Sequence, residues 1–259
     1  MMDTERAAEL LRRAEEERSP IDSLSKLFQE GPTLEEAFRI CEINIRRRLD
    51  QGEKLAGYKV GLTNVEVRKQ LGFPDSTYGC LMEGMILESG GRLDMGELIA
   101  PKIECEICFK LKGDLRGKDI STEAVLEASE GVCGSFEICD ARLKDWKCSY
   151  EEFFADNGCS ARVVLSGEWH PVDSVDLLGE TVTLSKDGTP IAEGKGEMAM
   201  GHPAKAVAWL AGKLAERDQY LKAGQIVMTG TLTPMIGIEK GATYRADFST
   251  LGTVRMTFS

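Results

Sequence analysis

Two glutamates stand two residues apart in the stretch PKIECEICF, residues 101–109. The stretch alternates apolar and polar residues as a half-buried β-strand does, so Glu104 and Glu106 are expected on one face of that strand. Side chains two apart on a strand lie roughly 7 Å from each other, and two carboxylates there repel unless water or a cation lies between them. This face therefore meets either solvent or a metal ion.

A third glutamate, Glu137, lies between Phe136 and Ile138 in the strand-like stretch SFEICD. Three carboxylates, with water or substrate completing the shell, suit a hard cation such as Mg²⁺ or Mn²⁺ better than zinc. An isolated Glu-x-Glu on a strand is usually its solvated face. Spacing alone therefore leaves both interpretations open.

The chain contains eight cysteines, and two of them, Cys105 and Cys108, form a Cys-x-x-Cys. On an alternating strand an offset of three places the two sulfurs on opposite faces, so this pair is a poor zinc or redox motif. We expect Cys105 to pack inward and Cys108 to share the face of the glutamates. Dispersed cysteines suit a reducing compartment, so all eight are expected to be thiols.

The overall charge excludes two classes of partner. Forty-three acidic residues against 32 basic ones give a net charge of −11, which repels nucleic acid and anionic membranes. The first residues are charged rather than apolar, and no stretch approaches the roughly 20 apolar residues that span a bilayer. We therefore expect a cytoplasmic protein.

Helical patterns dominate residues 3–50. A first amphipathic helix is expected to end near Ser19, and a second to begin with the capping box formed by Thr33 and Glu36. From Tyr58 onward, short strand-like runs are broken by glycine, and KDGTP and EKGATY are typical of hairpin turns.

Later helices are expected only at Thr122–Ala128 and at Pro203–Arg217. His202 precedes the second of these as a cap and His170 lies in a loop, so no histidine-centred triad is expected. The order of elements predicts an α+β chain. Residues 1–85 would form a small helical N-terminal region that carries the Lys59 strand, and residues 86–259 a β-rich catalytic domain.

Seven blocks follow one another along the chain: GYKVGLT, YGCL, PKIECEICF, EICDARLKDW, ADNGCSARVVLSG, GHPAKAVAWLAGKL and MTGTLT. In these blocks the sequence resembles the family of 2-keto-4-pentenoate hydratases and 2-oxo-3-hexenedioate (4-oxalocrotonate) decarboxylases, within the fumarylacetoacetate hydrolase superfamily. The resemblance implies a mixed-sheet body of the fumarylacetoacetate hydrolase type. It also implies a homo-oligomer larger than a dimer and an association with a paired enzyme of the family.

The resemblance assigns the metal and a catalytic residue. In this family the Glu-x-Glu and the later strand glutamate hold the catalytic divalent metal, which maps here to Glu104, Glu106 and Glu137. The family's active-site lysine falls on Lys59. This lysine would supply positive charge to the substrate, or would move protons if burial lowers its pKa.

The resemblance also suggests residues that bind substrate. Thr229, Gly230 and Thr233 in MTGTLT resemble the substrate-binding loop, where N–H and hydroxyl groups hold a carboxylate. Thr77 stands where hydratases of the family carry an aspartate before the aromatic-glycine pair, while Asp75 lies two residues earlier.

The implied function is a divalent-metal-dependent lyase acting on 2-oxo or 2-hydroxy dienoic acids of aromatic meta-cleavage catabolism. Hydration and decarboxylation of such acids share a dienolate that a metal ion stabilises. Three local features slightly favour the 2-oxo-3-hexenedioate decarboxylase over the alternative, a 2-hydroxypentadienoate hydratase. They are the neutral residue Thr77, the residue Lys102, and the MTG of the stretch MTGTLT. A non-catalytic partner subunit of the same fold is the alternative from another class, and the presence of the glutamates and Lys59 speaks against it.

Overall fold

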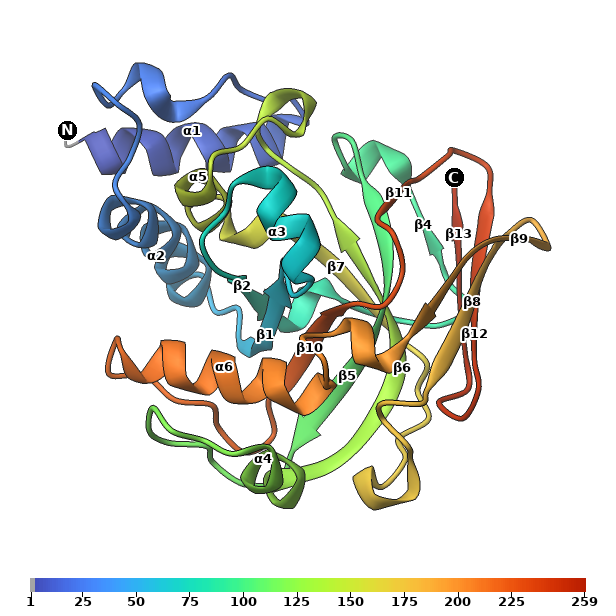
Figure 1. Cartoon of the computed structure of the whole chain (residues 1–259). Helices are drawn as coiled ribbons and strands as arrows, with labels where there is room; N and C mark the ends of the chain where they lie inside the picture. Colours follow the sequence, from blue (N-terminus) through green and yellow to red (C-terminus); the bar gives the residue numbers. More distant parts are fainter. Residues whose placement is uncertain (1–2) are drawn as a thin grey trace.

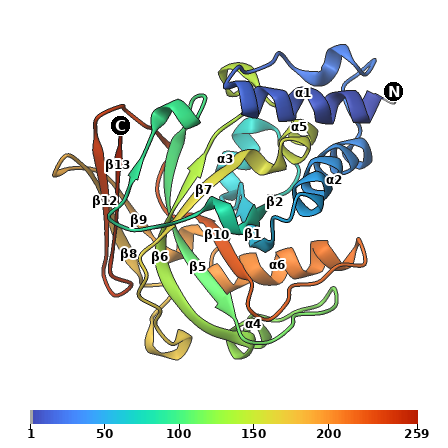
Figure 2. The ribbon, with the colours of Figure 1, turned by 180° about the vertical axis from the view of Figure 1, so that it is seen from behind.

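The computed structural model describes residues 3–259, and its helices and two sheets form separate layers (Figure 1). Helices α1 and α2 pack against each other and against α5 beside the large sheet, while the small sheet lies on the opposite side of the molecule (Figure 2). The helices are α1 (Asp3–Glu17), α2 (Leu34–Asp50), α3 (Val65–Leu71), α4 (Thr122–Ala128), α5 (Tyr150–Ala155) and α6 (Pro203–Ala215).

The large sheet has eight strands in the order β2-β1-β10-β5-β6-β7-β3, with β11 also paired to β5. It is mixed, because β1 pairs β10 and β3 pairs β7 in parallel while the other pairs are antiparallel. Its strands are β1 (Leu55–Gly61), β2 (Thr77–Met82), β3 (Ile86–Glu88), β5 (Lys102–Leu111), β6 (Ser129–Cys139), β7 (Ser160–Leu165), β10 (Ile226–Thr231) and β11 (Ile236–Gly237).

The small sheet has five strands in the order β4-β13-β12-β8-β9. These are β4 (Arg92–Leu93), β8 (Thr181–Lys186), β9 (Thr189–Lys195), β12 (Thr243–Phe248) and β13 (Thr253–Phe258). Residues of this sheet, such as Tyr244, share one apolar core with Ile107 and Phe109 of β5 and with Leu210 of α6. One face of the large sheet is thereby filled, and polar side chains of β5 are directed to the other face.

The predicted helices are confirmed, with small differences at their ends. In α2, Thr33 Oγ1 accepts the Glu36 N–H at 3.3 Å and Glu36 Oε2 accepts the Thr33 N–H at 2.7 Å, which is the predicted capping box. Helix α4 has the predicted bounds, and α6 ends at Ala215 rather than at Arg217. The short helices α3 and α5 were not predicted, because six or seven residues give too little apolar periodicity to recognise.

One of the two predicted hairpins forms. Strands β8 and β9 pair across Asp187 and Gly188, both with positive φ, as KDGTP predicts. The prediction for EKGATY is wrong, because β11 pairs with β5 whereas β12 pairs with β13 and β8. Gly241 provides a turn there, but the strands on its two sides belong to different sheets.

The cysteine predictions are confirmed. Every cysteine in the described chain is a free thiol. Cys105 is buried in the main core, whereas Cys108 belongs to a second apolar cluster with Cys133 and Met228. The two sulfurs of the Cys-x-x-Cys therefore lie on opposite faces of β5, and they cannot share one zinc ion.

Strands β1 and β2 fall within the first 85 residues, yet they extend the large sheet through the pairing of β1 with β10. The division of the chain at residues 85 and 86 stays a prediction. Among the described helices, none combines the length and apolar character needed to cross a membrane.

Candidate metal centre and active site

The antiparallel register of β5 and β6 brings the predicted glutamates onto one surface. Glu104 lies directly opposite Glu137, and Glu106 lies opposite Ser135, the residue two positions before Glu137. Like charges directly opposite each other on neighbouring strands destabilise a sheet. A cation beside them would turn this unfavourable arrangement into a favourable one.

The burial of Glu106 and Glu137 makes a nearby cation more favourable still. The exposed fractions of Glu106 and Glu137 are 0% and 1%. In the part of the chain that the structure describes, neither carboxylate oxygen of Glu137 takes part in a hydrogen bond, and Glu106 Oε1 has no hydrogen-bond partner either. Buried carboxylates without partners are costly, so this donor set fits a hard divalent ion, which binds carboxylate oxygens.

The most compact group of ligand atoms differs from the predicted one. The carboxylate oxygens of Glu104 and Glu137 and the sulfur of Cys139 all lie within 4.8 Å of one another. Glu106 does not belong to this group, and its Oε2 accepts the Gly230 N–H at 2.8 Å. Cys139 is two residues after Glu137 on the same strand, so the strand periodicity that places Glu104 with Glu106 could also have identified it.

The carboxylates perturb one another. Burial, followed by the charge of Glu137, raises the pKa of Glu104 to about 7. Burial and the charges of Glu137 and Glu104 raise the pKa of Glu106 well above its ordinary value. Both shifts have the same cause, which is negative charge held out of water without enough positive charge nearby.

Lys59 on β1 supplies part of that positive charge. Its Nζ lies 3.2 Å from Glu137 Oε1, and both side chains are almost completely buried. Burial opposes the charged form of Lys59, but the carboxylates, led by Glu137, outweigh it and raise the pKa of Lys59 above its ordinary value. Of the two roles considered for Lys59, this direction favours the supply of positive charge over the movement of protons.

Two glycines leave the space that the lysine side chain occupies. A Cβ on Gly61 would lie 3.2 Å from Lys59 Nζ, and a Cβ on Gly158 would lie 2.8 Å from Lys59 Cε. Gly158 also has a φ of +63°, which favours glycine. Neither glycine was singled out from the sequence, because only the fold brings residue 158 against β1.

Thr77 lies on the same side of β1 and β2 as Lys59. It is fully buried, its Oγ1 has no hydrogen-bond partner within residues 3–259, and this oxygen would be 3.0 Å from a Cβ on Gly61. Thr63, which follows β1, likewise has a buried and unpartnered hydroxyl. That Thr77 contacts the substrate stays a prediction.

The segment of residues 229–233, the predicted substrate-binding loop, forms hydrogen bonds with β5. Thr229 Oγ1 donates to the Ile107 carbonyl at 2.9 Å, and Thr233 Oγ1 accepts the Cys105 N–H at 3.3 Å. Gly230 has a φ of +96°, and a Cβ there would lie 2.3 Å from Thr63 Oγ1. The loop thus positions the Gly230 N–H against Glu106, while its contact with substrate stays a prediction.

Residues 92–259 match the family model for the fumarylacetoacetate (FAA) hydrolase C-terminal region. The chain belongs to the fumarylacetoacetate hydrolase family. It is 34% identical over 256 residues to a 2-keto-4-pentenoate hydratase of Paraburkholderia phymatum, covering 98% of this chain and 97% of that protein. It is also 34% identical over 229 residues to a 2-hydroxyhexa-2,4-dienoate hydratase of Comamonas testosteroni, covering 88% and 87%.

A solved structure of this fumarylacetoacetate hydrolase family is similar over almost the whole chain. The 4-oxalocrotonate decarboxylase from Pseudomonas putida G7, complexed with magnesium and adipate, gives a TM-score of 0.95 at 31% identity and covers 99% of this chain and 97% of that one. A second structure of that decarboxylase is complexed with calcium and acetate. The predicted family and fold are confirmed, and the named relatives include hydratases and a decarboxylase.

Polar residues near the glutamates form hydrogen bonds that position the surrounding backbone. Asp140 accepts the N–H groups of Ile99 and Ala100 at 2.7 and 2.8 Å. Asn157 exchanges two hydrogen bonds with the backbone of Cys80 on β2, at 2.7 and 2.9 Å. These contacts hold the ends of β5 and β6 and the segment that carries Gly158 in place.

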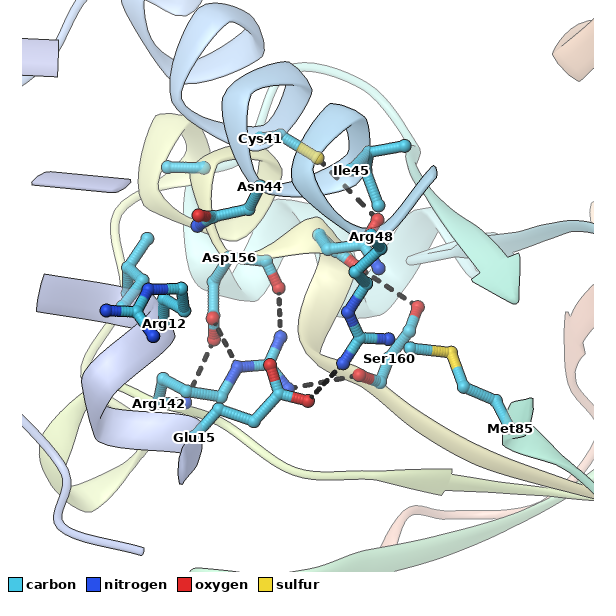
Figure 3. Close-up of a pocket in the computed structure, with 13 residues that line it drawn as sticks. Arg12, Glu15, Cys41, Asn44, Ile45, Arg48, Met85, Arg142, Asp156 and Ser160 are labelled. Atoms are coloured by element: carbon cyan, nitrogen blue, oxygen red, sulfur yellow. Dashed lines mark hydrogen bonds and ion pairs between the residues drawn. The ribbon is translucent and has the colours of Figure 1, made fainter. Parts of the chain in front are cut away.

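A small cavity lies apart from the glutamates, between α1, α2 and the segment after α5 (Figure 3). Its volume is about 40 Å³, enough for a water molecule. Within it the buried Arg142 forms an ion pair with Asp156 at 2.5 Å, and Arg48 forms one with Glu15 at 2.7 Å (Figure 3). Because these charges are already paired, the cavity offers no free charged group of this kind to a ligand among the described residues, and that the chemistry belongs to the glutamate cluster stays a prediction.

Proposed function

We propose that this protein is a divalent-metal-dependent lyase acting on 2-oxo or 2-hydroxy dienoic acids of aromatic meta-cleavage catabolism. The observation that carries the proposal is a group of buried carboxylate oxygens without hydrogen-bond partners in the described chain, Glu106 Oε1 and both oxygens of Glu137, with the buried Lys59 3.2 Å from Glu137. The similarity to hydratases and to a decarboxylase of such acids supports it. A non-catalytic subunit would have no reason to keep this costly arrangement.

Glu104, Glu106 and Glu137 would hold the metal, Mg²⁺ or Mn²⁺. When bound, such an ion supplies positive charge where the substrate's 2-oxo group becomes negative. The Gly230 N–H orients the Glu106 carboxylate, and Lys59 places a second positive charge beside Glu137. Lys59 would stabilise the negative charge of the dienolate by an electrostatic contact that exists before the reaction begins.

The residues near Lys59 slightly favour a substrate with two carboxylates, and hence the 2-oxo-3-hexenedioate decarboxylase. Thr77 adds no negative charge beside Lys59, so a second carboxylate meets less repulsion there than an aspartate would cause. Asp75 does not replace it, because its carboxylate lies 3.2 Å from Lys213 Nζ on α6. The alternative hydratase activity is supported by the 34% identity to the 2-keto-4-pentenoate hydratase.

The proposal is tested by supplying the protein and Mg²⁺ with 2-oxohex-3-enedioate and, separately, with 2-hydroxypenta-2,4-dienoate. We expect ultraviolet loss and CO₂ release from the dicarboxylate, and no activity after treatment with a chelator. Hydration of the monocarboxylate without CO₂ release from the dicarboxylate would select the hydratase. Inactivity on both substrates with Mg²⁺ or Mn²⁺ would contradict the proposed function.

Thr77→Asp should weaken the binding of the dicarboxylate substrate and leave the binding of the monocarboxylate substrate unchanged. A new negative charge beside the distal carboxylate should raise KM for 2-oxohex-3-enedioate by about tenfold, which corresponds to about 1.4 kcal/mol of repulsion. Thr77→Asn is the matched control, because it has the shape of the aspartate without its charge. If both variants raise KM equally, size rather than charge at residue 77 sets the preference.

The remaining parts of the proposal come from the family resemblance. We propose a homo-oligomer in the cytoplasm, with a paired enzyme of the family as a partner. The net charge of −11 agrees with a protein that binds a small anionic substrate through a local metal and lysine rather than through its overall field. Thr229 and Thr233 are proposed to shape the substrate pocket from the loop that carries Gly230.

A further inference from the structure

The carboxylate cluster contains a sulfur atom. Cys139, the last residue of β6, is 3% exposed, and its Sγ lies 3.8 Å from Glu104 Oε2. The ligand atoms of Cys139, Glu104 and Glu137 are mutually within 4.8 Å. Cys139 is thus the third member of the most compact set of metal-ligating atoms in the described chain.

An independent observation shows that this set lacks a ligand. Glu137 is 1% exposed, and across residues 3–259 neither of its carboxylate oxygens takes part in a hydrogen bond. Its close positive charge is Lys59 Nζ, 3.2 Å from Oε1. A cation between Glu104, Glu137 and Cys139 would coordinate the Glu137 oxygens, which the described chain leaves without a hydrogen bond.

The spacing fits a metal that binds both oxygen and sulfur. Zinc takes carboxylate oxygen at about 2.0–2.2 Å and thiolate sulfur at about 2.3 Å, and a tetrahedral angle then separates the two atoms by about 3.6 Å. The separation of Cys139 Sγ and Glu104 Oε2, at 3.8 Å, is close to that value. Little movement is needed to place one ion between them.

We propose that Cys139 makes this centre a capture site for thiophilic divalent ions, such as Zn²⁺ and Cd²⁺, which compete there with the hard ion. The inference rests on the proposed metal centre and adds a ligand to it. Mg²⁺ prefers oxygen and leaves the sulfur as a thiol, whereas a softer ion binds the sulfur and the thiol proton passes to solvent. A tetrahedral ion held by three side chains leaves few positions for a chelating substrate, so capture inhibits the enzyme.

Other cysteines lack this combination. Cys108 and Cys133 lie opposite each other in the same ladder but within an apolar cluster. Cys159 Sγ lies 3.6 Å from Asp156, but that carboxylate is already paired with Arg142. Only at Cys139 do the described residues place a thiol beside a buried carboxylate without a hydrogen-bond partner.

The test is a titration of the whole metal-free protein with Cd²⁺. The readout is the ultraviolet charge-transfer band that appears when sulfur binds cadmium. We expect a band that saturates at one ion per chain, that excess Mg²⁺ displaces, and that Cys139→Ser removes. The Cd²⁺ affinity should fall at least about tenfold in that variant, while the Mg²⁺ affinity measured by calorimetry changes less than about twofold. Cys148→Ser, which removes a half-buried thiol elsewhere, is the control and should keep the band.

The outcomes separate this inference from the proposed function. A wild-type protein that binds Mg²⁺ but shows no band, or a band that survives Cys139→Ser, overturns the role of Cys139 and leaves the proposed lyase intact. A protein that binds neither ion overturns the metal centre itself. Circular dichroism of each variant shows whether the fold is retained, and Cys139→Ala provides a second, smaller substitution if serine disturbs it.

Discussion

Glu106→Gln should abolish turnover and leave the protein folded. The fully buried Glu106 gives one oxygen to the Gly230 N–H, and the amide oxygen of the new side chain can accept that same hydrogen bond. The other oxygen, which has no partner in the described chain, would be replaced by an NH₂ group that cannot bind a cation. Losing the several kcal/mol that a metal supplies corresponds to a decrease in kcat of about 10³-fold or more.

A thermal-shift measurement separates lost metal binding from lost folding. Mg²⁺ at 100 times its Kd should stabilise the wild-type protein by about 2.7 kcal/mol and raise its Tm by several degrees. The variant should show no such rise, while its Tm in chelator stays at least as high as that of the wild type, because one of three mutually repelling carboxylates is gone. Glu130→Gln, an exposed glutamate on β6, is the matched control. A variant that still responds to Mg²⁺ would exclude Glu106 from the centre.

The sequence predicted the glutamates but not how they face one another. Strand periodicity places Glu104 and Glu106 on one face whatever the pairing, because side chains alternate along any strand. That Glu137 lies directly opposite Glu104 depends on the register of β5 and β6, which is set by the whole core and by the turns between the strands. Without that register, the strand pattern could single out Glu137 as a third carboxylate, and only the family resemblance predicted that it shares a metal with the other two.

The protonation of Lys59 shows a second limit of prediction from the sequence. From sequence, burial alone can be guessed, and burial alone would lower a lysine's pKa. The structure adds Glu137 at 3.2 Å, and this contact reverses the sign of the pKa shift. Long-range contacts of this kind, such as Gly158 against the lysine side chain, come from pairings between distant strands and have no local sequence signal.

Errors at the level of elements have the same origin. EKGATY has the composition of a hairpin turn, but the strand before it is bound by β5 in the other sheet. Helix α4, by contrast, has its predicted bounds, and its start is a local feature, since Ser121 Oγ accepts the Ala124 N–H within the same turn. The longer helices, decided by their own residues, were predictable, whereas the two short helices α3 and α5 and the features decided by pairing between sheets were not.

Lys59→Met should lower kcat by about 10²–10³-fold while divalent-ion binding is kept. Methionine retains an apolar stem as far as Cε, the atom that lies against Gly158, but it removes the terminal ammonium and its positive charge. The loss is of the size found when one preorganised electrostatic contact to a developing anion is removed. Since Lys59 Nζ lies 3.2 Å from Glu137 Oε1, its charge also competes with a cation for that carboxylate. The Mg²⁺ affinity of the variant should therefore equal or exceed that of the wild type.

Calorimetry with Mg²⁺ and a turnover assay on the same samples decide between this role and a structural one. If Lys59 only balanced the buried charge of Glu137, the variant would be less stable without metal, yet the loaded enzyme would turn over at nearly the wild-type rate. If kcat falls less than tenfold with Mg²⁺ bound, Lys59 acts only as a counter-ion of Glu137. Lys110→Met is the matched control, because Lys110 lies on β5 and pairs with the exposed Glu130. Its loss should leave both kcat and Mg²⁺ affinity unchanged, which ties any effect at Lys59 to its place beside the carboxylates.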